Sequence, residues 1–335
     1  MKTMKYLWVG LMVIFAACKP SAEEVTVYTS VDQVFSEPVL KDFERETGIR
    51  VKAVYDTEET KSTGVMNRLI AEKDNPQCDV FWSGDPIRNG VLQSKDITEP
   101  YQSAQTGQIP DYFKEPDNQW IGFSARARVL IYNKNLIAPD SLPNSVFDFT
   151  KSRFKGKFAI ANPLFGTTTF HMAAIYTALG DEKGKAWMNG LKTNGVVIAA
   201  SNGDVKKRVM NGELAFGLTD TDDAFEAKKE TDDVDYIFLD QQNGGIGTLI
   251  MPNAVSFIKN APHAENGKKL IDYLLSRETE AKLAISCAQI PLIQGTEVPD
   301  DVPSLDDIQP MKVDYQKTSD KLEEIQPWLK IWTEE

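Results

Sequence analysis

Hydrophobic and polar positions along this chain follow two alternating periods. Short runs rich in β-branched and aromatic residues, which predict strands, lie between stretches whose apolar residues recur every three or four positions, which predict helices. Strands are expected at 25–30, 49–55 and 79–82, and helices at 38–47 and 61–73. This order of strand, helix, strand, helix, strand is typical of a mostly parallel sheet covered by helices.

The same alternation continues through the rest of the sequence. Further strands are predicted at 129–132, 158–161, 195–200, 215–218 and 254–258, and further helices at 167–179, 204–211, 264–276, 278–286 and 319–332. A chain of 335 residues allows about two domains of ordinary size. We therefore expect an α/β protein with about two domains.

The first residues carry the features of an export signal. Two lysines precede an apolar run over residues 6–15, which is followed by two alanines and Cys18. A basic start, a short apolar core and small residues at a cleavage site predict a signal peptide over 1–17. The run is too short for a membrane-spanning helix, which needs roughly 20 apolar residues.

The Ala-Ala-Cys ending of this signal resembles the bacterial lipobox, which implies that Cys18 carries lipid. The residue three positions before the cysteine is Phe15, where the lipobox usually has leucine. The alternative is an ordinary signal with an incidental cysteine. The first interpretation predicts an exported lipoprotein whose only membrane attachment is its lipid, facing the periplasm or the cell exterior.

Composition excludes several classes of function. The formal net charge is −12, whereas binding to nucleic acid phosphates needs a basic face. The chain has two histidines and no Gly-x-Ser-x-Gly or His-Glu-x-x-His motif, so we expect no enzyme. An exported metal-dependent hydrolase is the remaining rival. Cys78 and Cys287 could form a disulfide, but we favour two buried thiols.

The order and type of several segments point to a known family. The segments are VTVYTS, VLKDFERETGIRVKAV, NRLIAEKDNPQCDVFWSGD, GFSARARVLIYNKNLI, FKGKFAIANPLFGTTTFHMAAI, VKKRVMNGELAFGL and YLLSRETEAKLA. They resemble bacterial periplasmic solute-binding proteins of ABC importers, in particular the ferric-iron-binding branch. The resemblance implies the two-lobed fold of type 2 periplasmic binding proteins, in which a hinge joins two α/β lobes and the ligand lies between them.

The resemblance also implies a domain organisation and a set of partners. A lipidated linker at 18–24 would precede the first part of lobe 1 at 25–123, lobe 2 at 124–252, and a return to lobe 1 with C-terminal helices at 253–335. The protein would be a monomer that needs no cofactor. It would deliver a small molecule or metal ion to an ABC permease and its ATPase.

Loops at the carboxyl ends of parallel strands line the crevice in such folds. We therefore expect ligand contacts from Ser30, Asp32, Ser83, Asp85, Arg126, Gly166, Thr167, Thr168, Asp220, Thr221, Asp222 and Asn253.

The acids in this set allow three interpretations. The ferric-binding branch has two adjacent tyrosines where this chain has Asp220 and Thr221. Hard cations such as Fe³⁺ accept carboxylate oxygens, so Asp32, Asp85, Asp220 and Asp222 could hold a metal. The same acids could instead accept hydrogen bonds from hydroxyls or amines of an organic solute, or cap helices.

A run of threonines after Gly166 opens an apolar helix, and a helix start with free N–H groups can hold an anion. The resemblance places an anion at this turn, whereas plain N-capping by a threonine is the alternative. Arg126 and Arg128 share one face of a strand, so one is expected to clamp an anion in the cleft and the other to pair with a surface acid. Ferric iron is the leading cargo, and a phosphorylated or anionic organic solute is the alternative.

Overall fold

The computed structural model describes residues 23–56 and 62–334. The predicted signal peptide and Cys18 lie outside these residues. Within the described ranges, no helix combines the length and apolarity needed to cross a membrane. Cys78 and Cys287 are both buried and unpaired, as the favoured interpretation of the two thiols predicted.

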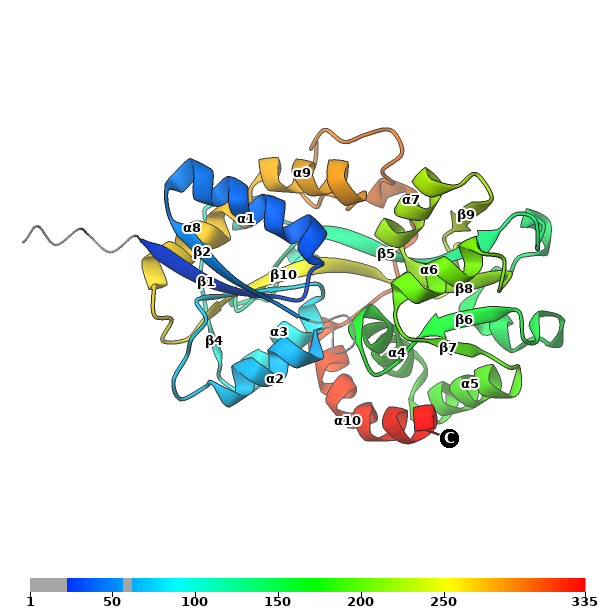
Figure 1. Cartoon of the computed structure of the whole chain (residues 1–335). Helices are drawn as coiled ribbons and strands as arrows, with labels where there is room; N and C mark the ends of the chain where they lie inside the picture. The colour runs from blue at the N-terminus through cyan, green and yellow to red at the C-terminus, as the bar shows by residue number, and fades with distance from the viewer. Residues whose placement is uncertain (1–22, 57–61, 335) are drawn as a thin grey trace, which may run out of the picture.

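Two lobes lie side by side and are joined by two long strands (Figure 1). Lobe 1 contains β1 (Glu24–Thr29), α1 (Gln33–Thr47), β2 (Arg50–Tyr55), α2 (Thr63–Ala71), β3 (Val80–Ser83), α3 (Pro86–Ser94), β4 (Thr98–Glu99), α8 (Ala264–Leu274) and α9 (Arg277–Cys287). Lobe 2 contains β6 (Phe158–Ala161), α4 (Gly166–Leu179), α5 (Asp181–Thr193), β7 (Val197–Ala199), α6 (Asn202–Met210), β8 (Phe216–Asp220), α7 (Thr221–Glu230) and β9 (Val234–Ile237). The predicted two-lobed α/β fold is confirmed.

The joining strands are β5 (Ile121–Asn133) and β10 (Ile250–Ile258). They pair with each other in antiparallel register, and the sheet order is β2-β1-β3-β10-β5-β8-β6-β7. Pairing is parallel from β1 to β2 and β3, and from β6 to β7 and β8. The sequence pattern found only 129–132 of β5, because polar residues interrupt the first half of a strand that is buried throughout.

Both joining strands depart from regular geometry at the crossing. Ser124 has a φ of 41°, and the register of β10 against β5 shifts between Pro252 and Asn253. The Asn253 side-chain amide donates to the carbonyl of Ser124 at 2.6 Å. Asn253 is fully buried and ties the two strands together, so its predicted role as a ligand contact is not what the structure shows.

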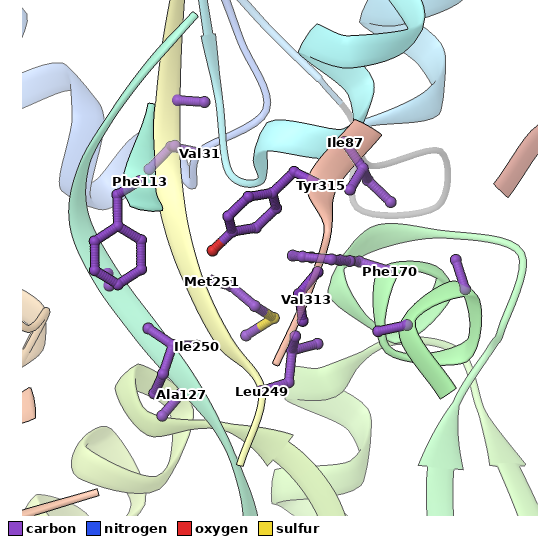
Figure 2. Packing of buried hydrophobic residues seen from close by; sticks show 14 of the residues in the cluster. Val31, Ile87, Phe113, Ala127, Phe170, Leu249, Ile250, Met251, Val313 and Tyr315 are labelled. Atoms are coloured by element: carbon purple, nitrogen blue, oxygen red, sulfur yellow. The ribbon is translucent and has the colours of Figure 1, made fainter. Parts of the chain in front are cut away.

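The apolar core is continuous from one lobe to the other beneath this crossing. Figure 2 shows Ile87 of α3, Met251 of β10 and Phe170 of α4 converging on Tyr315. Tyr315 begins α10 (Tyr315–Glu334), the last helix, which packs against both α3 and α4. Each large apolar side chain buried here contributes about 1.5–3 kcal/mol. The two lobes therefore meet on a packed apolar base.

Three helices were not predicted from the sequence pattern. Helix α3 is buried on nearly all sides, so it lacks the polar stripe that marks an amphipathic helix. Helix α5 begins with polar residues and contains two glycines. Helix α7 begins with Asp222 and Asp223 in its first turn, where negative charge favours a helix start. Those two acids are therefore part of a helix.

Candidate ligand-binding cleft

The cleft lies where several strands end and the following helices begin. In parallel α/β units the carboxyl ends of the strands share one edge, so the amino ends of the helices gather there too. Residues from the first turns of α1, α4, α6 and α7 line a cavity of about 250 Å³ between the lobes. Each such turn presents partial positive charge.

Eight of the twelve predicted contact residues line this cavity. They are Ser30, Asp32, Arg126, Gly166, Thr167, Thr168, Asp220 and Asp222.

The other four have different roles. Ser83 Oγ accepts from the backbone of Asp85, and Thr221 Oγ1 accepts from the backbone N–H of Ala127. Asp85 caps α3 by accepting from the N–H of Arg88 at 3.2 Å, and its other carboxylate oxygen pairs with the Arg88 guanidinium at 2.9 Å. The fourth, Asn253, joins the crossing strands. These side chains hold the walls of the cleft in place.

The start of α4, like those of α1 and α7, has no side-chain cap and so differs from the starts of α3 and α6. The capping positions of α3 and α6 are Asp85 and Ser201, and both side chains accept a backbone N–H of their own helix. The corresponding position of α4 is Phe165, which has no capping atom. Among the described residues, no acceptor is found for the N–H groups of residues 166–168. The threonines do not cap α4, so its first N–H groups are available to a ligand.

Arg126 brings a positive charge to the same place from β5. Its side chain is 8% exposed, and its Nη2 donates to the carbonyl of Gly84. A Cβ atom at Gly84 would lie 3.0 Å from Nη2, so glycine makes room for this approach. Nη1 lies 3.8 Å from an oxygen of Asp220 and 3.7 Å from one of Asp222. Within the described part of the chain, its Nε has no acceptor.

Arg128 and Asp220 form a closed network next to Arg126. Arg128 Nη1 and Asp220 Oδ1 are 2.7 Å apart, and the other oxygen of Asp220 accepts from Thr167 at 2.7 Å and from Asn202 at 3.1 Å. Burial opposes ionisation of Asp220, but the charges of Arg128 and Arg126 outweigh it and hold the pKa of Asp220 below its ordinary value. The predicted surface partner of the second arginine is therefore a buried acid.

The pKa values of Asp222 and Asp223 are shifted in the opposite direction from that of Asp220. Burial, reinforced by the neighbouring carboxylates, raises the pKa of Asp222 to about 8, although Arg126 works against the shift. Burial and the charge of Asp220 raise the pKa of Asp223 to about 6. At neutral pH the Asp222 carboxyl therefore carries a proton and can donate a hydrogen bond.

The predicted metal set of Asp32, Asp85, Asp220 and Asp222 is not assembled. Across residues 23–56 and 62–334, no three His, Cys, Asp or Glu side chains are placed to hold a metal ion. The physical reason is that Asp85 is occupied by α3 and Arg88, and Asp220 by Arg128, Thr167 and Asn202. The helix-capping interpretation describes Asp85, whereas Asp220 makes no side-chain cap and instead pairs with Arg128.

Sequence reasoning missed several lining residues, among them Gly84, Asn202 and Lys206. Ser201 and Asn202 lie two and three residues after the end of β7, so the strand-end rule that selected Asp32 and Asp220 could have found them. The strand-end rule also points to Gly84, which follows β3, but its contact with Arg126 of a distant strand could not be predicted locally. His171 is buried beside the cleft, and burial together with Arg128 lowers its pKa to about 3, which keeps it neutral.

Comparison with known proteins agrees with this architecture. The model of the family described as "Bacterial extracellular solute-binding protein" matches residues 39–309, and the chain belongs to that family. It is a substrate-binding protein of an ABC importer and not an enzyme, so the hydrolase alternative falls away.

Relatives with different cargoes in their names match most of the chain. "Iron uptake protein A1" of Synechocystis sp. is 27% identical over 82% of this chain and 77% of its own length. A "Putative 2-aminoethylphosphonate-binding periplasmic protein" of Salmonella typhimurium is 26% identical over 98% of this chain and 94% of its own length. The crystal structure of iron-bound HitA from Pseudomonas aeruginosa superposes with a TM-score of 0.83 at 21% identity, covering 92% of this chain and 99% of that one.

Proposed function

We propose that the cleft captures a small organic anion of the phosphonate or phosphate-ester type and presents it to the ABC permease. The observation that carries this proposal is the pairing of Arg126 with α4. A buried guanidinium with an unsatisfied donor lines the same cavity as the uncapped start of a helix.

The chemistry of these groups suits a tetrahedral anion. Its oxygens can accept from the N–H groups of residues 166–168 and from Arg126, and a guanidinium binds such oxygens through two parallel hydrogen bonds. A protonated Asp222 adds a donor to the same wall. The Salmonella relative named for 2-aminoethylphosphonate, which aligns over nearly the whole chain, supports this class of ligand.

Ferric iron is the second candidate cargo. "Iron uptake protein A1" and a relative named "Major ferric iron-binding protein" each match more than four-fifths of the chain, which supports the prediction from the sequence. In this chain the cleft presents Asp32, Asp222 and Asp223 without the set of ligands that an ion needs. Iron would therefore enter as a complex with an anion that occupies the Arg126 site.

A thermal-shift screen of the purified protein separates the two cargoes. The panel contains 2-aminoethylphosphonate, glycerol 3-phosphate, inorganic phosphate, ferric chloride and ferric citrate. A ligand at a hundred times its Kd stabilises the folded state by about 2.7 kcal/mol. We expect a shift with a phosphonate or a phosphate ester. Stabilisation by ferric iron alone would contradict the proposal.

Arg126→Gln tests which group carries the affinity. A hydrogen bond to a charged group contributes about 1.5–3 kcal/mol, so this variant should bind the same ligand roughly ten- to a hundredfold more weakly. Arg277→Gln is the matched control, because Arg277 also donates to a carbonyl, that of Gln294 at 3.0 Å, but lies on α9 away from the cavity. Equal affinity in the two variants would remove Arg126 from the site.

We also propose that the protein is held at the membrane by lipid on Cys18. The observation behind this is the Ala-Ala-Cys ending of the signal sequence. Cells fed labelled palmitate should incorporate label into the protein, and Cys18→Ser should abolish both the label and the partition into detergent. Label retained in the serine variant would place the lipid elsewhere.

A further inference from the structure

Arg88 is a buried arginine that does not line the cavity. It lies in the first turn of α3 in lobe 1, is 1% exposed, and is absent from the wall of the cleft. Its Nη1 makes two hydrogen bonds. One goes to Asp85 of the same helix at 2.9 Å, and the other goes to the carbonyl of Gly166 at 3.2 Å. Gly166 is the first residue of α4 in lobe 2, so this arginine bridges the two lobes.

The second bond joins a rigid group to the candidate anion site. Asp85 fixes the Arg88 guanidinium, and because both side chains are buried they have few alternative positions. Gly166 has a φ of +58° and a hypothetical Cβ there would contact nothing within 4 Å, so its own packing does little to fix this turn. Thr167 fixes this turn within lobe 2 through its bond to Asp220, and the bond from Arg88 adds a link from the same turn to lobe 1.

We infer that Arg88 is a positioning residue: it ties the start of α4 to lobe 1 and thereby sets the distance between the α4 N–H groups and Arg126. Arg126 is itself held to lobe 1 through the carbonyl of Gly84. The two halves of the anion site thus share one support in lobe 1, at residues 84–88. Opening of the lobes breaks the bond from Arg88 to Gly166, so the bond favours the closed arrangement and slows ligand release.

The consequence for the ligand rests on the proposed function, whereas the tie between the lobes does not. Two measurements keep them apart. Small-angle scattering of the ligand-free protein reports how open the lobes are. Stopped-flow release of 2-aminoethylphosphonate, or of whichever anion stabilises the protein in the screen, reports the dissociation rate.

The main variant is Asp85→Asn combined with Arg88→Gln. Because asparagine and glutamine are both neutral, this variant has no unpaired buried charge at positions 85 and 88. The asparagine can still cap α3. The glutamine is too short to reach the carbonyl of Gly166. The unmodified protein is the control, because it keeps both the ion pair between Asp85 and Arg88 and the bond from Arg88 to Gly166. We expect the double variant to have a larger radius of gyration than the control and to release the anion about tenfold faster, with a similar association rate.

Arg88→Lys provides a rescue and a second route if the double variant does not fold. Lysine keeps the charge opposite Asp85 but is shorter than arginine, so opening and release should fall between those of the control and of the double variant. Identical scattering of the control, the double variant and the lysine variant would overturn the inference. If no anion stabilises the unmodified protein, the proposed function fails, and the scattering of these variants still decides whether Arg88 ties the lobes.

Discussion

Helices α3 and α4 begin close together in the two lobes, where Arg88 of α3 contacts Gly166 of α4, but only α3 has a side-chain cap. The start of α3 is sealed, because Asp85 accepts the N–H of Arg88 and binds its guanidinium. The start of α4 is open, because Phe165 stands at its capping position and the N–H groups of the first turn face a cavity.

This difference shows how one fold makes both structural and binding helix ends. Every helix that begins at the cleft has the same partial positive charge at its start. Where a side chain of the protein satisfies that charge, the end is structural. Where it is left unsatisfied and a buried arginine is added, as at Arg126 beside α4, the end is suited to an anion from outside.

The largest effect is expected from removing the side-chain cap of α3. Asp85→Ala removes the cap and leaves the Arg88 charge buried without its partner, which should lower the free energy of unfolding by about 3–5 kcal/mol. Urea denaturation measures the change. Asp85→Asn can still cap the helix, so its free energy of unfolding should fall by less. If Asp85 binds ligand directly, the asparagine variant will also lose affinity, and that result would contradict the structural role described above.

An intermediate effect is expected from adding a capping side chain to the start of α4. Phe165→Asp transplants the capping residue of α3 onto α4, where its carboxylate satisfies the N–H groups and repels an anion. Affinity for a phosphonate should fall by roughly tenfold or more, since about 1.4 kcal/mol corresponds to a factor of ten. Isothermal titration measures it. Phe165→Leu controls for the lost ring and should retain binding, whereas unchanged affinity in the aspartate variant would place the anion elsewhere.

The smallest expected effect is a dependence of the phosphonate Kd on pH. The pKa of Asp222 is raised to about 8, so this carboxyl is neutral below that pH and negative above it. The new charge on the cleft wall repels an anion, so the Kd for a phosphonate should rise above pH 8, by at most about tenfold per pH unit. Titrations between pH 7 and about 9.5 test this. Asp222→Asn should remove the dependence, and an equally steep rise in that variant would assign it to another group.

The raised pKa of Asp222 also affects the free energy of unfolding. Between about pH 4 and pH 8 the folded state keeps a proton on Asp222 that the unfolded chain has lost. The contribution of this group to the free energy of unfolding therefore falls as pH rises through that window. This trend, unlike the binding trend, is present without ligand.

Most of the architecture could be predicted from local patterns in the sequence. Alternating strand and helix patterns, Gly48 after the first helix and the threonine run at 167–169 are local features, and local patterns are enough to place α/β units in order. Sequence reasoning also found eight lining residues: the strand-end rule gave Ser30, Asp32, Asp220 and Asp222, the helix start gave residues 166–168, and the strand period gave Arg126.

Which of those residues a ligand can use depends on contacts that form only in the folded protein. Asp85, Asp220 and Asp222 look alike in sequence, but one caps a helix, one neutralises Arg128 and one is protonated at neutral pH. Their states depend on burial and on partners as distant along the chain as Arg126. Charge interactions act through space over a few ångströms, so the local sequence cannot reveal them.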